Sequence, residues 1–102
     1  MDQSARKWAD RRSAERHDIR LEARARRPGR NYSVVTITDI STDGFAILGL
    51  ESYSPGADIT IYLPGLGPKL ATVMCQRDGR TGSRFFEPLH AAVVDHLAQR
   101  FG

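Results

Sequence analysis

Apolar and polar residues alternate with a period of two along much of this chain, and this alternation constrains the fold more than any other feature. Between His17 and Arg26, apolar residues stand at every second position with charged residues between them. Such alternation predicts a β-strand with one buried face. Further strands are predicted at residues 34–40, 45–50, 59–63, 70–77 and 81–86, from β-branched content, alternation and flanking turn residues.

Short turns separate the predicted strands. Residues 27–31 read Arg-Pro-Gly-Arg-Asn, and residues 64–68 form a hairpin loop rich in proline and glycine. Asp78-Gly79 is a strong signal for a two-residue turn. Since no segment between strands has room for a helix, the βαβ pattern is excluded and an antiparallel sheet is expected.

The period lengthens only after Pro88. Leu89, Val93 and Leu97 recur at every fourth residue, which predicts an amphipathic helix over residues 89–101. The fold class is therefore mainly β, with six short antiparallel strands and one C-terminal α-helix. This pattern by itself leaves a small barrel and an open two-layer sandwich equally open.

Length and cysteine content limit the organisation of the molecule. A chain of 102 residues suits one domain with a single core. We interpret residues 1–10, in which Trp8 is the one large apolar residue, as a flexible lead and residues 11–102 as the domain. The single Cys75 follows Val73 and Met74 in a predicted strand, which indicates a buried thiol.

Positive charge is concentrated near the N-terminus. Residues 1–31 carry ten of the fifteen lysines and arginines against five acidic residues, whereas residues 32–102 carry five against seven. Such a region attracts polyanions, whether a dinucleotide, a nucleic acid or an acidic protein surface. It restricts the charge of a ligand but not its identity.

Two short motifs point to a nucleotide site. Arg12 and Arg16 stand four residues apart just before the first strand, and Arg11 precedes them. The second motif, Asp39-Ile40-Ser41-Thr42-Asp43-Gly44, follows a strand rich in Val, Ile and Thr. Arginine forks suit phosphates and can stack on bases, and a carboxylate and a hydroxyl beside a glycine turn can recognise the edge of a base.

In order and spacing these motifs resemble the RxxxR and [D/N]xSxxG signatures of the PilZ domain, a bacterial receptor for the second messenger cyclic di-GMP. The resemblance extends from about Arg11 to the C-terminus. It favours the barrel, and it implies a six-stranded PilZ-like β-barrel with a C-terminal helix. Other Arg-x-x-x-Arg pairs occur, such as Arg20/Arg24, but these two arginines lie inside the first predicted strand and are expected to face solvent.

The resemblance also implies roles for individual residues. Arg12 and Arg16 would bind the phosphates and guanine faces of cyclic di-GMP, and Asp39 and Ser41 would bond to a guanine edge. Gly44 would permit the close turn, and Arg11 is a weaker candidate for a peripheral phosphate contact. A second interpretation of Asp39 and Ser41 is a strand-ending loop in which their side chains cap backbone amides.

Catalysis finds little support in the sequence. No HxxxH or CxxC pair is present to bind a metal, and Ser41 has no assigned base. We therefore expect no enzymatic activity, no metal and no cofactor beyond the ligand cyclic di-GMP.

Two other binding functions stay open. A basic small barrel could bind nucleic acid, but Tyr32, Tyr53 and Tyr62 have no shared spacing that would make a stacking platform. A PilZ-like module that binds only protein would be expected to have degenerate signatures, whereas all five signature residues are present here.

The expected setting is a cytoplasmic signalling adaptor. No apolar stretch approaches the roughly 20 residues that span a bilayer, and the first thirty residues lack the apolar core of a signal peptide. We predict that cyclic di-GMP orders the N-terminal arginine arm and that an unidentified downstream protein reads the change. We expect a monomer or weak dimer that does not use nucleic acid as its partner.

Overall fold

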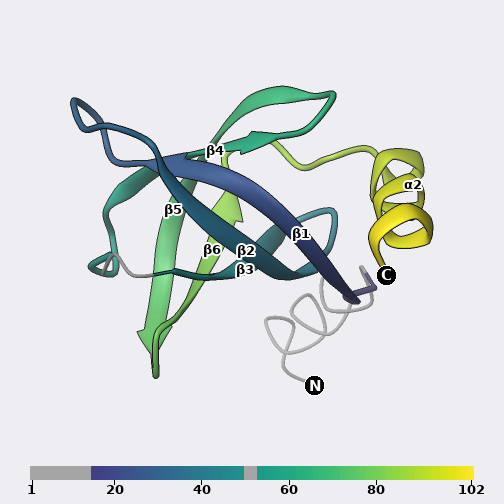
Figure 1. Cartoon of the computed structure of the whole chain (residues 1–102), viewed down its shortest axis with the longest axis horizontal. Coiled ribbons are helices and arrows are strands. Elements are labelled where there is room, and N and C mark those ends of the chain that lie inside the picture. The colour runs from purple at the N-terminus through teal and green to yellow at the C-terminus, as the bar shows by residue number, and fades with distance from the viewer. Residues whose placement is uncertain (1–14, 50–52) are drawn as a thin grey trace, which may run out of the picture.

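The computed structural model describes residues 15–49 and 53–102, in which six antiparallel strands close into a barrel with a helix beside it (Figure 1). The elements are β1 (His17–Arg26), β2 (Ser33–Ile40), β3 (Gly44–Leu48), β4 (Asp58–Leu63), β5 (Gly67–Arg77), β6 (Arg80–Phe85) and α2 (Ala91–Phe101). The strand order around the barrel is β1-β2-β3-β6-β5-β4, and β4 pairs with β1 to close it. The predicted fold class is confirmed, and the open sandwich is wrong. The predicted lead at residues 1–10 lies outside the described residues.

The alternation of β1 determines which of its faces is buried. Ile19, Leu21, Ala23 and Ala25 are buried, and the charged residues between them point outward. Arg20 and Arg24 are exposed, as predicted. The other strands contribute alternate residues to the same interior, so the core is a single cluster inside the barrel.

Turn chemistry accounts for the hairpins. Asp78 and Gly79 have φ angles of 54° and 78°, which is the left-handed backbone that a tight two-residue hairpin needs. This predicted turn is confirmed. The loop predicted at residues 64–68 is shorter in the structure, because Gly67 and Pro68 pair with Leu63 and Tyr62 as the start of β5.

The prediction that Cys75 is buried is wrong, because its thiol is exposed. The pairing of β5 with β6 shifts register between Val73 and Cys75. Such a bulge adds one residue to a strand and interrupts the alternation of its faces. Met74 and Cys75 are consequently both exposed, whereas Val73 is buried.

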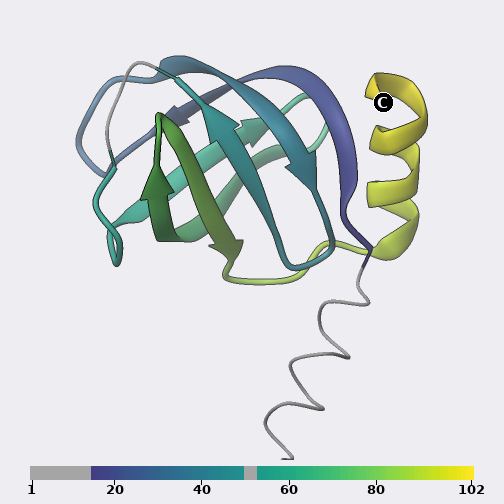
Figure 2. The same ribbon diagram turned by 90° about the horizontal axis from the view of Figure 1, so that it is seen from below.

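Helix α2 packs beside the start of β1 (Figure 2). Val94 and Leu97 are its buried residues. The helix begins at Ala91, two residues after the predicted start, because Nδ1 of His90 accepts a hydrogen bond from the amide of Ala92 at 3.0 Å and caps the helix. In the part of the chain that the structure describes, no helix is long and apolar enough to cross a membrane.

Candidate functional site

Arg16 and Asp39, one from each sequence motif, meet at the end of the barrel where β1 begins. The guanidinium Nη2 of Arg16 lies 3.3 Å from Oδ1 of Asp39, as a hydrogen bond within an ion pair. The Asp39 side chain is 13% exposed and that of Arg16 is 69% exposed. Asp39 is thus held by the barrel, while Arg16 reaches it from the solvent side and can be turned toward a ligand.

The strand pairings near Arg16 and Asp39 contain two register shifts. The register of β1 against β2 shifts between Asp18 and Leu21, and that of β2 against β3 shifts between Ile37 and Asp39. A β-bulge redirects the side chains beside it. In β2, Ile37 and Ile40 are buried three residues apart, and Asp39 between them is left partly accessible. The charge of Asp39 therefore faces the rim of the barrel and not its apolar core.

Ser41 holds the loop between β2 and β3 in shape. Its hydroxyl Oγ accepts hydrogen bonds from the amides of Asp43 and Gly44, both at 3.2 Å. The amide of Ser41 donates to the carbonyl of Gly44 at 2.9 Å. Ser41 is 8% exposed. The capping interpretation of this serine is therefore realised, and its contact with a guanine edge stays a prediction.

Gly44 is needed for a close approach between strands. A Cβ atom at this position would meet the backbone carbonyl oxygen of Ser83 in β6 at 2.2 Å, far inside contact distance. The φ angle of Gly44 is not positive, so the turn itself does not require glycine here. Any side chain would push β3 away from β6 and disturb the loop that begins with Ser41.

Arg11 and Arg12 lie outside the described residues. Of the predicted site residues, the structure thus brings together Arg16 and Asp39, and it places Ser41 and Gly44 in the adjoining loop. The order of the two motifs in the chain predicted this convergence. A strand, a turn and a second strand lie between them and return the chain to the same end of the barrel.

The site is connected to α2 by contacts that the sequence did not indicate. Nε2 of His17 lies 3.9 Å from Oδ1 of Asp95 in the helix and 4.0 Å from Oε1 of Glu15. On the other side, the carbonyl of Thr42 accepts a hydrogen bond from the amide of Leu89 at 2.8 Å. The loop of the site is therefore hydrogen-bonded to the segment that leads into α2, and His17, next to Arg16, lies close to Asp95 of the helix. No motif marks the contacts with Asp95 and Leu89, because each joins residues that are far apart in the chain.

Two tyrosines that lack a shared spacing also come together. Tyr32 and Tyr62 flank β1, with ring centroids 5.7 Å apart in an edge-to-face arrangement. The guanidinium carbon of Arg26 lies 4.9 Å from the centroid of Tyr32. Tyr53, by contrast, is buried in the core. The two tyrosines come together because β1 pairs with β2 on one side and with β4 on the other. The spacing of the tyrosines along the chain does not show this contact.

Among known protein families, the family model of the PilZ domain matches residues 10–100. This range includes both motifs, all six strands and nearly all of α2. A search of curated proteins finds no match.

Proposed function

Because the chain belongs to the PilZ domain family, a family of cyclic di-GMP receptors, we propose that it binds cyclic di-GMP and acts as an adaptor without turnover. The meeting of Arg16 and Asp39 at 3.3 Å is the observation that carries this proposal. It brings a cationic fork and a carboxylate, 23 residues apart in the chain, to one accessible position at the barrel end. That is the pair of groups which a ligand with phosphates and guanine edges requires.

In the proposed complex each group has its own task. Arg16, with Arg12 and Arg11 from the preceding segment, binds the phosphates and guanine faces. The Asp39 carboxylate accepts hydrogen bonds from the ring N–H and amino group of a guanine. Ser41 and Gly44 hold the loop in place, and Ser41 is a predicted second contact to the base.

The pair also supports a switch. Arg16 is bonded to Asp39 in the structure, so each of these groups already has the other as a partner. Phosphates and a guanine edge compete for both partners, and the arginine arm gains contacts that exist only in the liganded state. Such differential contacts are what a ligand needs to shift a conformational equilibrium. A downstream protein then recognises the ordered arm or the surface beside it.

Isothermal titration calorimetry with cyclic di-GMP tests the proposal most directly. We expect binding by the wild-type chain and a loss of roughly 10- to 150-fold in affinity for Arg16→Ala, which corresponds to one charge-assisted contact of about 1.5–3 kcal/mol. Asp39→Ala should weaken binding at least as much. Arg20→Ala is the matched control, because Arg20 is an exposed arginine inside β1 and should leave the affinity within about twofold.

Competing ligands complete the test. GTP and cyclic AMP carry phosphates and a purine but lack the arrangement of two guanines, so they should bind far more weakly at physiological salt. Equal binding of these nucleotides would contradict the proposal, since a site that selects by charge alone does not distinguish base edges. An effect of Arg20→Ala as large as that of Arg16→Ala would show that the wrong arginine pair had been assigned.

Single-stranded nucleic acid is the second candidate ligand, and the Tyr32–Tyr62 pair is the observation that favours it. Base stacking on aromatic rings beside arginines is a common mode of binding single strands. A fluorescein-labelled oligonucleotide measured by anisotropy separates the two functions. Binding as tight as that of cyclic di-GMP, lost in Tyr62→Ala but retained in Arg16→Ala, would replace the receptor function by this one.

A further inference from the structure

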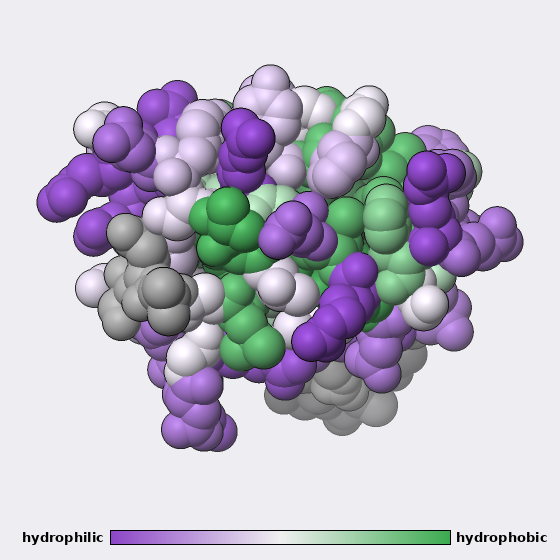
Figure 3. All heavy atoms as spheres, viewed as in Figure 1, coloured by the Kyte–Doolittle hydropathy of each residue, from purple (hydrophilic) through white to green (hydrophobic). Residues whose placement is uncertain are grey.

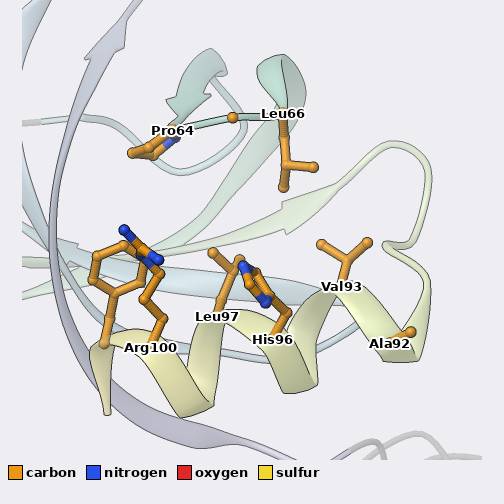
Figure 4. Close-up of a pocket in the computed structure, with 9 residues that line it drawn as sticks. Pro64, Leu66, Ala92, Val93, His96, Leu97 and Arg100 are labelled. Atoms are coloured by element: carbon orange, nitrogen blue, oxygen red, sulfur yellow. The ribbon is translucent and has the colours of Figure 1, made fainter.

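A groove lies between α2 and the turn that joins β4 to β5. Pro64 and Leu66 of the turn form one wall, and Val93, Leu97 and Phe101 line the other (Figure 4). Its volume is about 500 Å³, within the range of roughly 300–1,000 Å³ that ligand sites occupy. None of these five residues belongs to the proposed nucleotide site.

The groove offers an apolar stripe that the described part of the chain does not fully cover. Val93, Leu97 and Phe101 recur at every fourth residue of α2 and extend for about 12 Å along the helix. Leu97 belongs to the core, Val93 and Phe101 are partly buried, and Leu66 is 36% exposed. Apolar side chains gather on the side of the molecule where the barrel faces α2 (Figure 3). The accessible apolar surface is therefore that of Leu66 and the open sides of Val93 and Phe101, and apolar surface bordered by polar groups can mark a place of association.

The rim of the groove carries the positive charge of Arg100. His96 and Arg100 stand four residues apart on α2 and extend toward the β4–β5 turn (Figure 4). Within residues 15–49 and 53–102, no carboxylate lies within 4.0 Å of Arg100. The one acidic residue of α2, Asp95, faces His17 instead. An acidic partner would therefore meet a guanidinium that forms no ion pair with any residue the structure describes.

The segment that leads into α2 is hydrogen-bonded to the loop of the nucleotide site. The amides of Phe85 and Leu89, which precede α2, donate to the carbonyls of Asp43 and Thr42 at 2.9 and 2.8 Å. A ligand that moves the loop between Ser41 and Gly44 therefore acts on the residues that position α2.

We propose that this groove docks an acidic amphipathic helix of a partner protein, and that the loop hydrogen bonds couple this docking to nucleotide binding. A straight stripe at four-residue spacing suits the apolar face of a helix, and the guanidinium charge of Arg100 suits glutamates beside that face. The coupling rests on the proposed function, whereas the docking does not.

Two model peptides test the docking. One is a fluorescein-labelled amphipathic helical peptide with leucines at positions i, i+3, i+4 and i+7 and glutamates elsewhere, and the other carries lysines in place of the glutamates. By fluorescence anisotropy, the Leu/Glu peptide should bind the wild-type chain at least tenfold more tightly than the Leu/Lys peptide. Arg100→Glu should reverse this preference. Equal binding of the two peptides, or no binding of the Leu/Glu peptide, would overturn the docking proposal.

Matched variants locate the contact. Leu66→Asp should weaken binding of the Leu/Glu peptide at least tenfold, and Leu70→Asp, an exposed leucine on β5 outside the groove, should change it less than twofold. Arg30→Glu alters the net charge as Arg100→Glu does, but from the β1–β2 turn, and should preserve the peptide preference. Equal losses in Leu66→Asp and Leu70→Asp would show that the peptide binds elsewhere. Circular dichroism verifies that each variant is folded.

The coupling is measured by repeating the peptide titration with saturating cyclic di-GMP. We expect the peptide affinity to change at least threefold, and the nucleotide affinity to change by the same factor when peptide is present, as linkage requires. Nucleotide and peptide that both bind without affecting one another would overturn the coupling. If the chain binds no cyclic di-GMP, the proposed function and the coupling fail, while the preference for the Leu/Glu peptide still decides the docking.

Discussion

At the scale of single residues, Gly44 links the stability of the barrel to the shape of the site. A Cβ here would stand 2.2 Å from the Ser83 carbonyl oxygen, and a backbone group cannot rotate away as a side chain can. Gly44→Ala should therefore lower the melting temperature and also weaken cyclic di-GMP binding, because the adjoining loop moves. Differential scanning calorimetry and titration calorimetry measure the two effects.

Gly29→Ala is the control for this prediction. Gly29 has a φ of 77°, and a Cβ added to it would have no neighbouring atom within 4 Å, so alanine is penalised there only by its left-handed backbone, roughly 1–2 kcal/mol. It should lose stability and keep its nucleotide affinity. A Gly44→Ala variant that also kept full affinity would show that the loop does not depend on the β3–β6 approach.

A second prediction at this scale concerns Cys75. Because its thiol is exposed at the β5 bulge, Ellman's reagent should titrate one equivalent of thiol in the folded protein within minutes. A thiol that reacts only after addition of denaturant would contradict the exposed position and restore the buried one that the sequence had indicated. The sequence misled here because Val73, Met74 and Cys75 are all apolar, and a bulge leaves no sign in such a run.

At the scale of the elements, the period of the sequence predicted most of what the structure contains. The six strands and the helix were found from alternation and spacing, and the errors are confined to one to three residues at their ends. Those ends depend on contacts that the local sequence does not encode. Gly67 and Pro68 look like loop residues but extend β5 because Leu63 and Tyr62 pair with them.

The start of α2 offers a test of one such end. His90 caps the helix through Nδ1, so His90→Ala should reduce the free energy of unfolding by about 0.5–2 kcal/mol, the usual effect of losing an N-cap. His90→Asn should retain most of this stability, because asparagine also accepts from the second helical amide. His96→Ala, at an exposed position of the same helix, should be neutral. Urea unfolding followed by circular dichroism distinguishes the three, and equal stability of His90→Ala and wild type would contradict the cap.

At the scale of the whole molecule, closure of the barrel separates the core from the site. Ile61 of β4 pairs with Ala25 of β1 and is fully buried, so Ile61→Ala should lower the free energy of unfolding by about 2–5 kcal/mol. Asp39→Ala should change it little, since its partner Arg16 is 69% exposed and ion pairs with a solvated partner contribute roughly 0–1 kcal/mol. Urea unfolding should therefore show a loss of stability in Ile61→Ala but not in Asp39→Ala. Nucleotide titration should show a loss of affinity in Asp39→Ala but not in Ile61→Ala. A large loss of stability in Asp39→Ala would mean that this residue is structural.

Closure of the barrel also creates contacts around the site that could not be predicted from the sequence. Motif order was enough to place Arg16 near Asp39, because only a hairpin separates them. The bonds from Thr42 and Asp43 to the segment before α2 join distant parts of the chain, and the β1–β4 pairing joins strands more than thirty residues apart. Such contacts leave no periodic pattern in the sequence. The hydrogen bonds that connect the site with the segment before α2 could therefore be found only in the three-dimensional structure.

Amide hydrogen exchange across the chain tests whether this connection is used. We predict that cyclic di-GMP slows exchange over residues 8–17, since the arginines of the arm would gain contacts to the phosphates. Exchange at the amides of Phe85 and Leu89 should also change, because both donate to the loop of the site. The helix interior is bonded within itself and should change little. Equal protection of residues 8–17 with and without ligand would exclude a switch through the arm, and a change at Leu89 alone would then assign the signal to the loop and α2.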